Sequence, residues 1–178
     1  NSTSADALRI ANKYQLALSP DAAACLRQET PKALDNVHSL VTGSVKVLCA
    51  AAAHEAKALG YEPLILTASL SCQAREAGSF LAAIAQYHQD SEKSLCFIAG
   101  GETVVKLTGT GLGGRNQELA LSAAQGIAGL RDTAVFSLGS DGTDGPTDAA
   151  GGYCDQDTAA RLAAQGIDIH HVLQDNDA

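Results

Sequence analysis

Short apolar runs alternate along the chain with longer amphipathic stretches, and the two patterns predict different elements. A short aliphatic run is typical of a buried strand, whereas apolar residues at helical spacing are typical of one face of a helix. The first pattern predicts strands at residues 37–41, 64–67, 95–98, 103–107 and 133–138. The second predicts two short helices within residues 4–30, divided at Ser19-Pro20, and further helices at 44–59, 74–87, 115–128 and 157–165. Strands that alternate with helices predict an α/β fold, in which helices flank parallel or mixed sheet layers.

The composition indicates a folded chain with a core of small and aliphatic residues. Apolar residues make up 46% of the 178 residues and charged residues 18%, which excludes a mainly disordered chain. Because aromatic residues are only 4%, the core must consist of Ala, Leu, Val and Ile. The length suits one large or two small domains, and a change of pattern near residues 90–100 favours two, at 1–92 and 93–178.

Charge and cysteine content narrow the function classes. The net charge of −8 disfavours nucleic-acid binding, which depends on basic residues. No apolar run reaches the roughly 18 residues of a membrane span, so we expect no membrane partner. The five cysteines are scattered and form no CxxC pair, which is typical of the reducing cytoplasm. Because the chain starts at Asn1 and contains no Met, we expect it to be an internal piece of a longer protein.

A glycine-rich turn at residues 109–114 leads into the helix that begins with Arg115, and this arrangement favours anion binding. Backbone N–H groups and the positive end of a helix attract a phosphate or carboxylate, and Arg115 adds a planar guanidinium fork. The glycines also fit the GxGxxG spacing of a dinucleotide site, but polar residues fill the first helical turn and no acidic residue ends the following strand. The alternative is a tight connector with Arg115 in solvent.

A second candidate is the loop at residues 139–152, which follows a predicted strand and carries Asp141, Asp144 and Asp148. Ligands of open α/β sheets bind beyond the carboxyl ends of strands, and clustered carboxylates need a cation or hydrogen-bond donors to offset their repulsion. The loop therefore suits a magnesium–phosphate site or a base beside a substrate hydroxyl. The alternative is a loop whose carboxylates cap backbone N–H groups. Gly101 and Glu102, directly after the strand at 95–98, form a third candidate.

Three motifs occur in an order and at a spacing that resemble a known family. They are Gly100-Gly101-Glu102-Thr103, Gly113-Gly114-Arg115-Asn116-Gln117-Glu118 and the run from Asp141 to Gly151. Together they resemble the MOFRL domain, the C-terminal part of the glycerate 2-kinase family, some of whose members are labelled hydroxypyruvate reductase. Residues 37–87 resemble the end of that family's first domain. The resemblance thus implies the end of a Rossmann-like domain at 1–92 and a MOFRL α/β domain, truncated at its C-terminus, at 93–178.

The resemblance implies transfer of the γ-phosphoryl group of ATP, with Mg²⁺, to the 2-hydroxyl of D-glycerate. As catalytic residues it implies Arg115, which would stabilise charge on the phosphoryl group, and Asp141, which would orient or deprotonate the hydroxyl. The residues that it implies for binding substrate or phosphate are Gly101, Glu102, Gly113, Gly114, Asn116 and Asp144. The metal ligands stay unidentified.

Two departures from the family pattern bear on activity. The usual Gly-Glu-Ala-Arg-like stretch is here Cys72-Gln73-Ala74-Arg75, and the family's first half is absent. We therefore expect the chain alone to be inactive as a kinase. An NAD(P)H-dependent hydroxypyruvate reductase and a non-catalytic folding or oligomerisation module stay open as alternatives, as does a homodimer.

Overall fold

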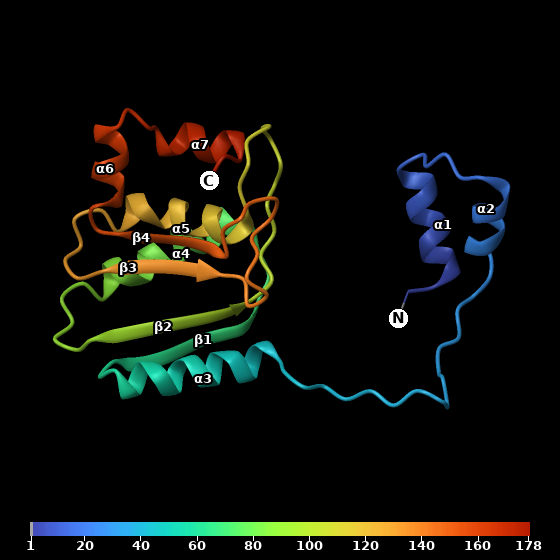
Figure 1. Cartoon of the computed structure of the whole chain (residues 1–178), viewed down its shortest axis with the longest axis horizontal. Coiled ribbons are helices and arrows are strands. Elements are labelled where there is room, and N and C mark those ends of the chain that lie inside the picture. Colours follow the sequence, from blue (N-terminus) through green and yellow to red (C-terminus); the bar gives the residue numbers. More distant parts are fainter. Residues whose placement is uncertain (1) are drawn as a thin grey trace. The chain divides into compact units, whose positions relative to one another are not determined.

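The computed structural model describes residues 2–178, which form two compact units with the division between Thr42 and Gly43. The first unit contains two short helices, α1 (Ser4–Lys13) and α2 (Pro20–Leu26) (Figure 1). Thr3 and Asp6 form a capping box at the start of α1, and Ser19 caps α2 directly before Pro20. The two predicted helices and their division at Ser19-Pro20 are therefore confirmed.

The strand predicted at residues 37–41 is wrong. These residues belong to no helix or strand, and Leu40 and Val41 are 86% and 80% exposed. A strand needs a partner that satisfies its backbone N–H and C=O groups, and an apolar run does not supply one by itself. The segment is irregular chain that leads to the second unit.

The second unit contains a parallel pair of strands, β1 (Glu62–Leu70) and β2 (Leu95–Gly101). Helix α3 (Val45–Ala58) begins after Ser44, whose side chain accepts a hydrogen bond from the N–H of Val47, and it packs against both strands (Figure 1). Helix α4 (Ala74–Tyr87) connects the strands, as parallel pairing requires. The predicted strands and helices of this region are confirmed.

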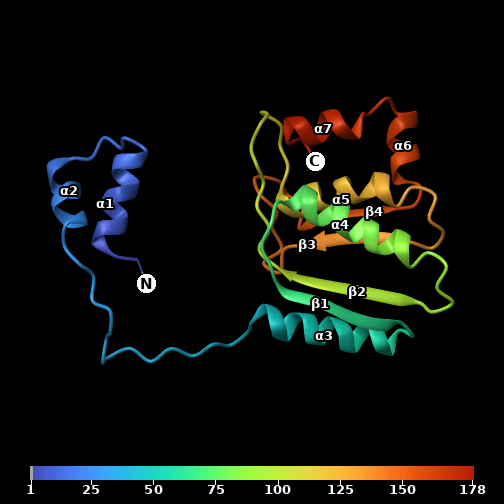
Figure 2. The same cartoon turned by 180° about the vertical axis from the view of Figure 1, so that it is seen from behind.

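The rest of the second unit is built on an antiparallel pair, β3 (Ala134–Leu138) and β4 (Gly151–Asp155). Helix α5 (Arg115–Gly126) packs against both strands and against α4, and Figures 1 and 2 together show the two helices on one side of the pair. A Cβ on Gly78 of α4 would overlap the carbonyl of Leu119 in α5, so the two helices are in close contact. Small residues make this approach possible, and they dominate the core cluster of Ala82, Ala123, Ala124, Ile127, Cys154 and Ile169.

Two short helices, α6 (Thr158–Ala164) and α7 (Ile169–Asp175), complete the chain. The helix predicted at 157–165 corresponds to α6, whereas neither α7 nor β4 was indicated by the sequence pattern. The strand predicted at 103–107 is wrong, because in this segment only Val104 forms a bridge, with Gln73, and Leu107 is 80% exposed. No helix among the described residues is long and apolar enough to cross a membrane.

The sheet pairing confirms an α/β fold with both parallel and antiparallel strands flanked by helices. Strand β1 lies before the predicted domain boundary at residues 92 and 93, strand β2 lies after it, and the two strands pair with each other. The contacts divide the chain elsewhere, after Thr42. The boundary at 92 and 93 and the Rossmann-like character of the first part stay predictions.

Candidate functional site

Arg115 opens α5, and its guanidinium faces a carboxylate from a different turn. Nη1 of Arg115 lies 2.7 Å from Oε1 of Glu102, which directly follows β2. The side chains of Arg115 and Glu102 are 39% and 73% exposed, so this ion pair is open to solvent and to an incoming ligand. A surface pair of this kind contributes at most about 1 kcal/mol to stability.

Asp141 comes from the turn that follows β3 and lies within the electrostatic reach of Arg115. A hydrogen bond from the N–H of Thr143 to Oδ1, at 3.3 Å, holds the pKa of Asp141 below its ordinary value, and the positive charge of Arg115 contributes in the same direction. The structure thus pairs Arg115 with Glu102 directly, whereas Asp141 is linked to Arg115 only through the effect of its charge. Asp141 is exposed and remains ionised at neutral pH.

Asp144 lies beneath this surface and caps the start of α5. It is 1% exposed, and its carboxylate accepts hydrogen bonds from the N–H of Asn116 at 3.0 Å, the side-chain amide of Asn116 at 2.9 Å and the N–H of Gln117 at 2.8 Å. The buried Asn116 in turn accepts a hydrogen bond from the hydroxyl of Ser137 in β3, at 2.6 Å. The positive end of α5, which the sequence suggested for a phosphate, thus receives a carboxylate of the chain itself.

Two of the predicted glycines are explained by close approach of other groups. A Cβ on Gly114 would overlap the carboxylate of Asp144, and a Cβ on Gly101 would overlap the backbone of Leu70 in β1. Gly114 therefore lets Asp144 reach the helix start, and Gly101 lets the chain leave β2 alongside β1. Asp148, the third carboxylate of the loop, is exposed.

Removing the Asp144 cap should destabilise the second unit. Asp144→Ala leaves the buried N–H of Asn116 and the part-buried N–H of Gln117 without their acceptor, so we expect a loss of about 2 kcal/mol in the free energy of unfolding. Urea unfolding followed by circular dichroism measures this loss, with the exposed Asp148→Ala as the matched control from the same loop. Equal midpoints for the two variants would show that Asp144 is not a cap.

The glycine-rich turn is also occupied by the chain itself, which differs from the open anion site that the sequence suggested. Asn176 accepts hydrogen bonds from the N–H groups of Thr108 and Gly109, and Asp175 accepts those of Thr110 and Gly111. Asp177 accepts the N–H of Leu112, at 2.9 Å. A Cβ on Gly113 would lie 2.8 Å from the backbone nitrogen of Ala178, so this glycine too borders the C-terminal residues. The residues that fill the turn lie more than 60 positions further along the chain.

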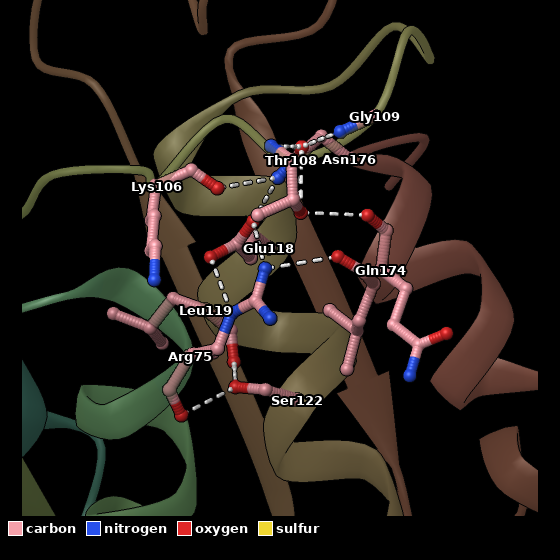
Figure 3. Close-up of polar contacts among 10 residues, drawn as sticks. Arg75, Lys106, Thr108, Gly109, Glu118, Leu119, Ser122, Gln174 and Asn176 are labelled. Atoms are coloured by element: carbon pink, nitrogen blue, oxygen red, sulfur yellow. Dashed lines mark hydrogen bonds and ion pairs between the residues drawn. The ribbon is translucent and has the colours of Figure 1, made fainter.

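A buried ion pair between α4 and α5 is a feature that sequence reasoning missed. Nε of Arg75 lies 3.2 Å from Oε1 of Glu118, whose side chain is 2% exposed, and both residues contact the C-terminal segment (Figure 3). In the sequence Glu118 is the last of four polar residues at the helix start, so nothing marks it as buried. Its partner could not be assigned, because Arg75 lies 43 positions earlier in a different helix.

The candidate site lies on an open surface of this chain. Two hollows of about 350 and 200 Å³ are found elsewhere, one bordered by Gln125, Ala163 and Ile169 and one by Gln117, Gly152 and Tyr153. Neither is lined by Arg115, Glu102 or Asp141. Within residues 2–178, no group of three or more His, Cys, Asp or Glu side chains is arranged to hold a metal ion.

Comparison with known proteins identifies relatives over the whole chain. Residues 95–178 match the model of the MOFRL family. The chain is 46% identical to a D-glycerate 2-kinase of Thermotoga maritima over an alignment that covers 100% of this chain and 44% of that protein. It is 36% identical to a protein of Agrobacterium vitis with the provisional name hydroxypyruvate reductase, with 97% and 47% covered.

The fold agrees with these relationships. A crystal structure of a glycerate kinase from Thermotoga maritima matches this chain with a TM-score of 0.80 at 47% identity. The match covers 99% of this chain and 44% of that one. The chain therefore spans less than half the length of the relatives that it matches.

Proposed function

We propose that this chain is the C-terminal part of an ATP-dependent glycerate 2-kinase. The premises are that residues 95–178 belong to the MOFRL family and that the whole chain is similar to glycerate 2-kinases. The reaction forms a bond between the 2-oxygen of D-glycerate and the γ-phosphorus of ATP. It breaks the bond from that phosphorus to the β,γ-bridging oxygen, and the products are phosphoglycerate, ADP and the hydroxyl proton. The observation that carries the proposal is the exposed ion pair between Arg115 and Glu102, which come from two different turns, with the charge of Arg115 also acting on Asp141.

Arg115 has the position and charge to stabilise the transferring phosphoryl group. Phosphoryl transfer spreads negative charge over the three equatorial oxygens, and a planar guanidinium can bind two of them at once. Glu102 holds the guanidinium from one side, at 2.7 Å, without withdrawing it from solvent. A fixed cation at this point lowers the barrier because it needs no reorientation as the charge develops.

Asp141 is the acceptor that we propose for the glycerate hydroxyl. Its carboxylate is exposed, and its lowered pKa keeps it ionised and able to accept a hydrogen bond at neutral pH. The hydroxyl donates to this carboxylate while its oxygen approaches the γ-phosphorus, and the proton passes to Asp141 as the new bond forms. The main contribution is orientation of the nucleophile.

We propose supporting roles, without substrate contact, for most of the other implied site residues around Arg115 and Asp141. Asp144 and Asn116 are buried and hydrogen-bonded to each other, so we propose that they fix the start of α5 and do not contact substrate. Gly101, Gly113 and Gly114 also have a structural role, because the absence of a side chain lets neighbouring groups of the chain approach them closely. Glu102 combines both roles: it contacts Arg115 as a supporting residue, and it is exposed enough to contact substrate.

The described residues offer few groups that could bind ATP or Mg²⁺. The N–H groups from Thr108 to Leu112 are taken by residues 175–177, so they do not form a cradle for nucleotide phosphates. Mg²⁺ usually binds substrate phosphates with one or two carboxylates and several waters, and the described residues provide no further ligand cluster. We therefore assign no step to the metal, and we propose that most nucleotide contacts come from the part of the enzyme outside this chain.

The alternative function, reduction of hydroxypyruvate with a nicotinamide cofactor, rested on the GxGxxG spacing of residues 109–114 and on the hydroxypyruvate reductase label of some family members. In dinucleotide sites this turn binds the pyrophosphate through free N–H groups. Here the corresponding groups donate to Asp175, Asn176 and Asp177. The geometry therefore favours the kinase.

The two functions predict different products from the whole enzyme. We expect release of ADP when D-glycerate and ATP are added, measured by a coupled assay, and no consumption of NADH when hydroxypyruvate is added. The chain alone should release no ADP above background, because more than half of the relative's length lies outside it. NADH consumption by the whole enzyme, without ADP release, would refute the proposal.

A further inference from the structure

A buried polar network connects α4, α5 and the end of α7, and the reaction described above does not use it (Figure 3). Glu118 is 2% exposed and Asn176 is 4% exposed. Glu118 pairs with Arg75, and Arg75 also donates to the carbonyl of Leu173 in α7, at 2.9 Å. Burial of a charge is unfavourable unless it is paired and hydrogen-bonded, and the Glu118 carboxylate meets both conditions through Arg75 and Asn176.

Asn176 is the centre of this network. Its Oδ1 accepts hydrogen bonds from the N–H groups of Thr108 at 2.7 Å and Gly109 at 2.9 Å. Its Nδ2 donates to the carbonyl of Lys106 at 3.2 Å and to Oε2 of Glu118 at 3.3 Å. An amide side chain offers two acceptor and two donor positions, so Asn176 uses all of them. Neither a shorter nor an apolar side chain could make this set of contacts.

Asn176 is connected to Arg115 through the glycine-rich turn, because it binds the start of the turn and Arg115 follows its end. The segment that it holds, from Lys106 to Gly109, opens the glycine-rich turn that ends at Arg115. Asp144 fixes the other end of this turn at the start of α5. Because glycines leave the turn itself intrinsically flexible, its course depends on the groups that hold its ends.

We propose that Asn176 is a positioning residue for the phosphoryl-transfer site, acting through the glycine-rich turn to place the guanidinium of Arg115. The inference rests on the proposed function. Asn176 does not touch substrate: its effect is transmitted by the hydrogen bonds to Thr108 and Gly109 and by the pairing of Glu118 with Arg75.

The first test compares two glycine substitutions at left-handed backbone positions in the whole enzyme. Asn176 has φ 58° and Asp132 has φ 55°, so glycine keeps both backbones unstrained. Asn176→Gly should lower kcat about tenfold or more, with a change in KM for glycerate of less than about threefold. Asp132→Gly, at an exposed position, should change neither value. An unchanged kcat in folded Asn176→Gly, at a temperature well below its unfolding midpoint, overturns the proposal.

The second test is a rescue that a purely structural role would not produce. Asn176→Asp keeps the acceptor for Thr108 and Gly109 but sets a carboxylate against Glu118, so kcat should fall. Adding Glu118→Gln removes the repelling charge, supplies an amide donor and leaves a neutral hydrogen-bond acceptor for Arg75, so kcat should recover about fivefold or more relative to Asn176→Asp alone, with Glu118→Gln alone measuring the effect of the lost ion pair. Failure to recover, with both variants folded, contradicts the proposal.

Amide hydrogen exchange separates this inference from the proposed function. The N–H groups of Thr108 and Gly109 should exchange about tenfold faster or more in Asn176→Gly than in the unmodified enzyme. If they do, and the unmodified enzyme still does not phosphorylate glycerate, the proposed function fails while the role of Asn176 in holding the turn stands. Unchanged exchange rates overturn the inference whatever the activity.

Discussion

Replacing Arg115 with alanine in the whole enzyme is expected to lower kcat for glycerate phosphorylation by about 10³-fold, because a single guanidinium on the transferring phosphoryl group contributes on that scale. The fold should persist, since the side chain is 39% exposed and its ion pair with Glu102 is at the surface. Arg115→Lys should recover only part of the loss, because an ammonium group keeps the charge but not the two-point contact. Steady-state ADP release at saturating glycerate and ATP measures both values.

The matched control is an arginine in a similar surface ion pair away from the site. Arg161 lies 2.6 Å from Asp155 and is 56% exposed. Arg161→Ala should leave kcat within about twofold of the unmodified enzyme, because surface substitutions away from special features change little. If Arg115→Ala behaved like Arg161→Ala, Arg115 would have no role in phosphoryl transfer.

The largest expected effect on stability is that of Glu118→Ala. The change leaves the guanidinium of Arg75 without its partner, removes an acceptor from Asn176 and creates a cavity beside α4. Breaking a buried ion pair by removing one member costs about 3–5 kcal/mol, and because Arg75 is 27% exposed we expect the lower end of this range. The midpoint of urea unfolding, followed by circular dichroism, gives the change.

Glu76, an exposed glutamate on α4, provides the comparison for this loss. Glu76→Ala removes the same charge from a helix but leaves no buried partner, so its effect should stay within about 0.5 kcal/mol. A loss below about 1 kcal/mol in Glu118→Ala would mean that water or other side chains replace the pair without cost.

Local signals in the sequence were sufficient to place most of the helices. Ser19 and Ser44 are side-chain caps at the predicted helix starts, and the helix predicted from Arg115 begins at that residue. Capping depends on residues within one turn of each other, so the sequence contains the whole interaction. The strands predicted at 37–41 and 103–107 failed because a strand depends on a partner elsewhere in the chain, which an apolar run does not reveal.

The site shows the same limit. The sequence showed which charged residues lie in the candidate turns. It did not show that Asp144 caps the start of α5, because the N–H groups that donate to Asp144 lie 27 and 28 positions earlier in the chain. The sequence suggested that the glycine-rich turn is an open anion site, whereas its N–H groups donate to oxygens of residues 175–177 of the same chain. That these oxygens belong to Asp175 and Asp177 depends on α7, which the sequence pattern did not indicate.

The central claim is that Arg115 and Asp141 serve one phosphoryl transfer, Arg115 at the phosphoryl group and Asp141 at the attacking hydroxyl, and a double-mutant cycle tests it most directly. Arg115→Ala, Asp141→Ala and the double variant are compared by kcat in the whole enzyme. We predict strong non-additivity: kcat of the double variant should lie within about twofold of kcat of the slower single variant. Residues that act as a unit lose their function together, so the second substitution has little left to remove. Two effects that simply multiply, or an Asp141→Ala variant with unchanged kcat, would contradict a shared site.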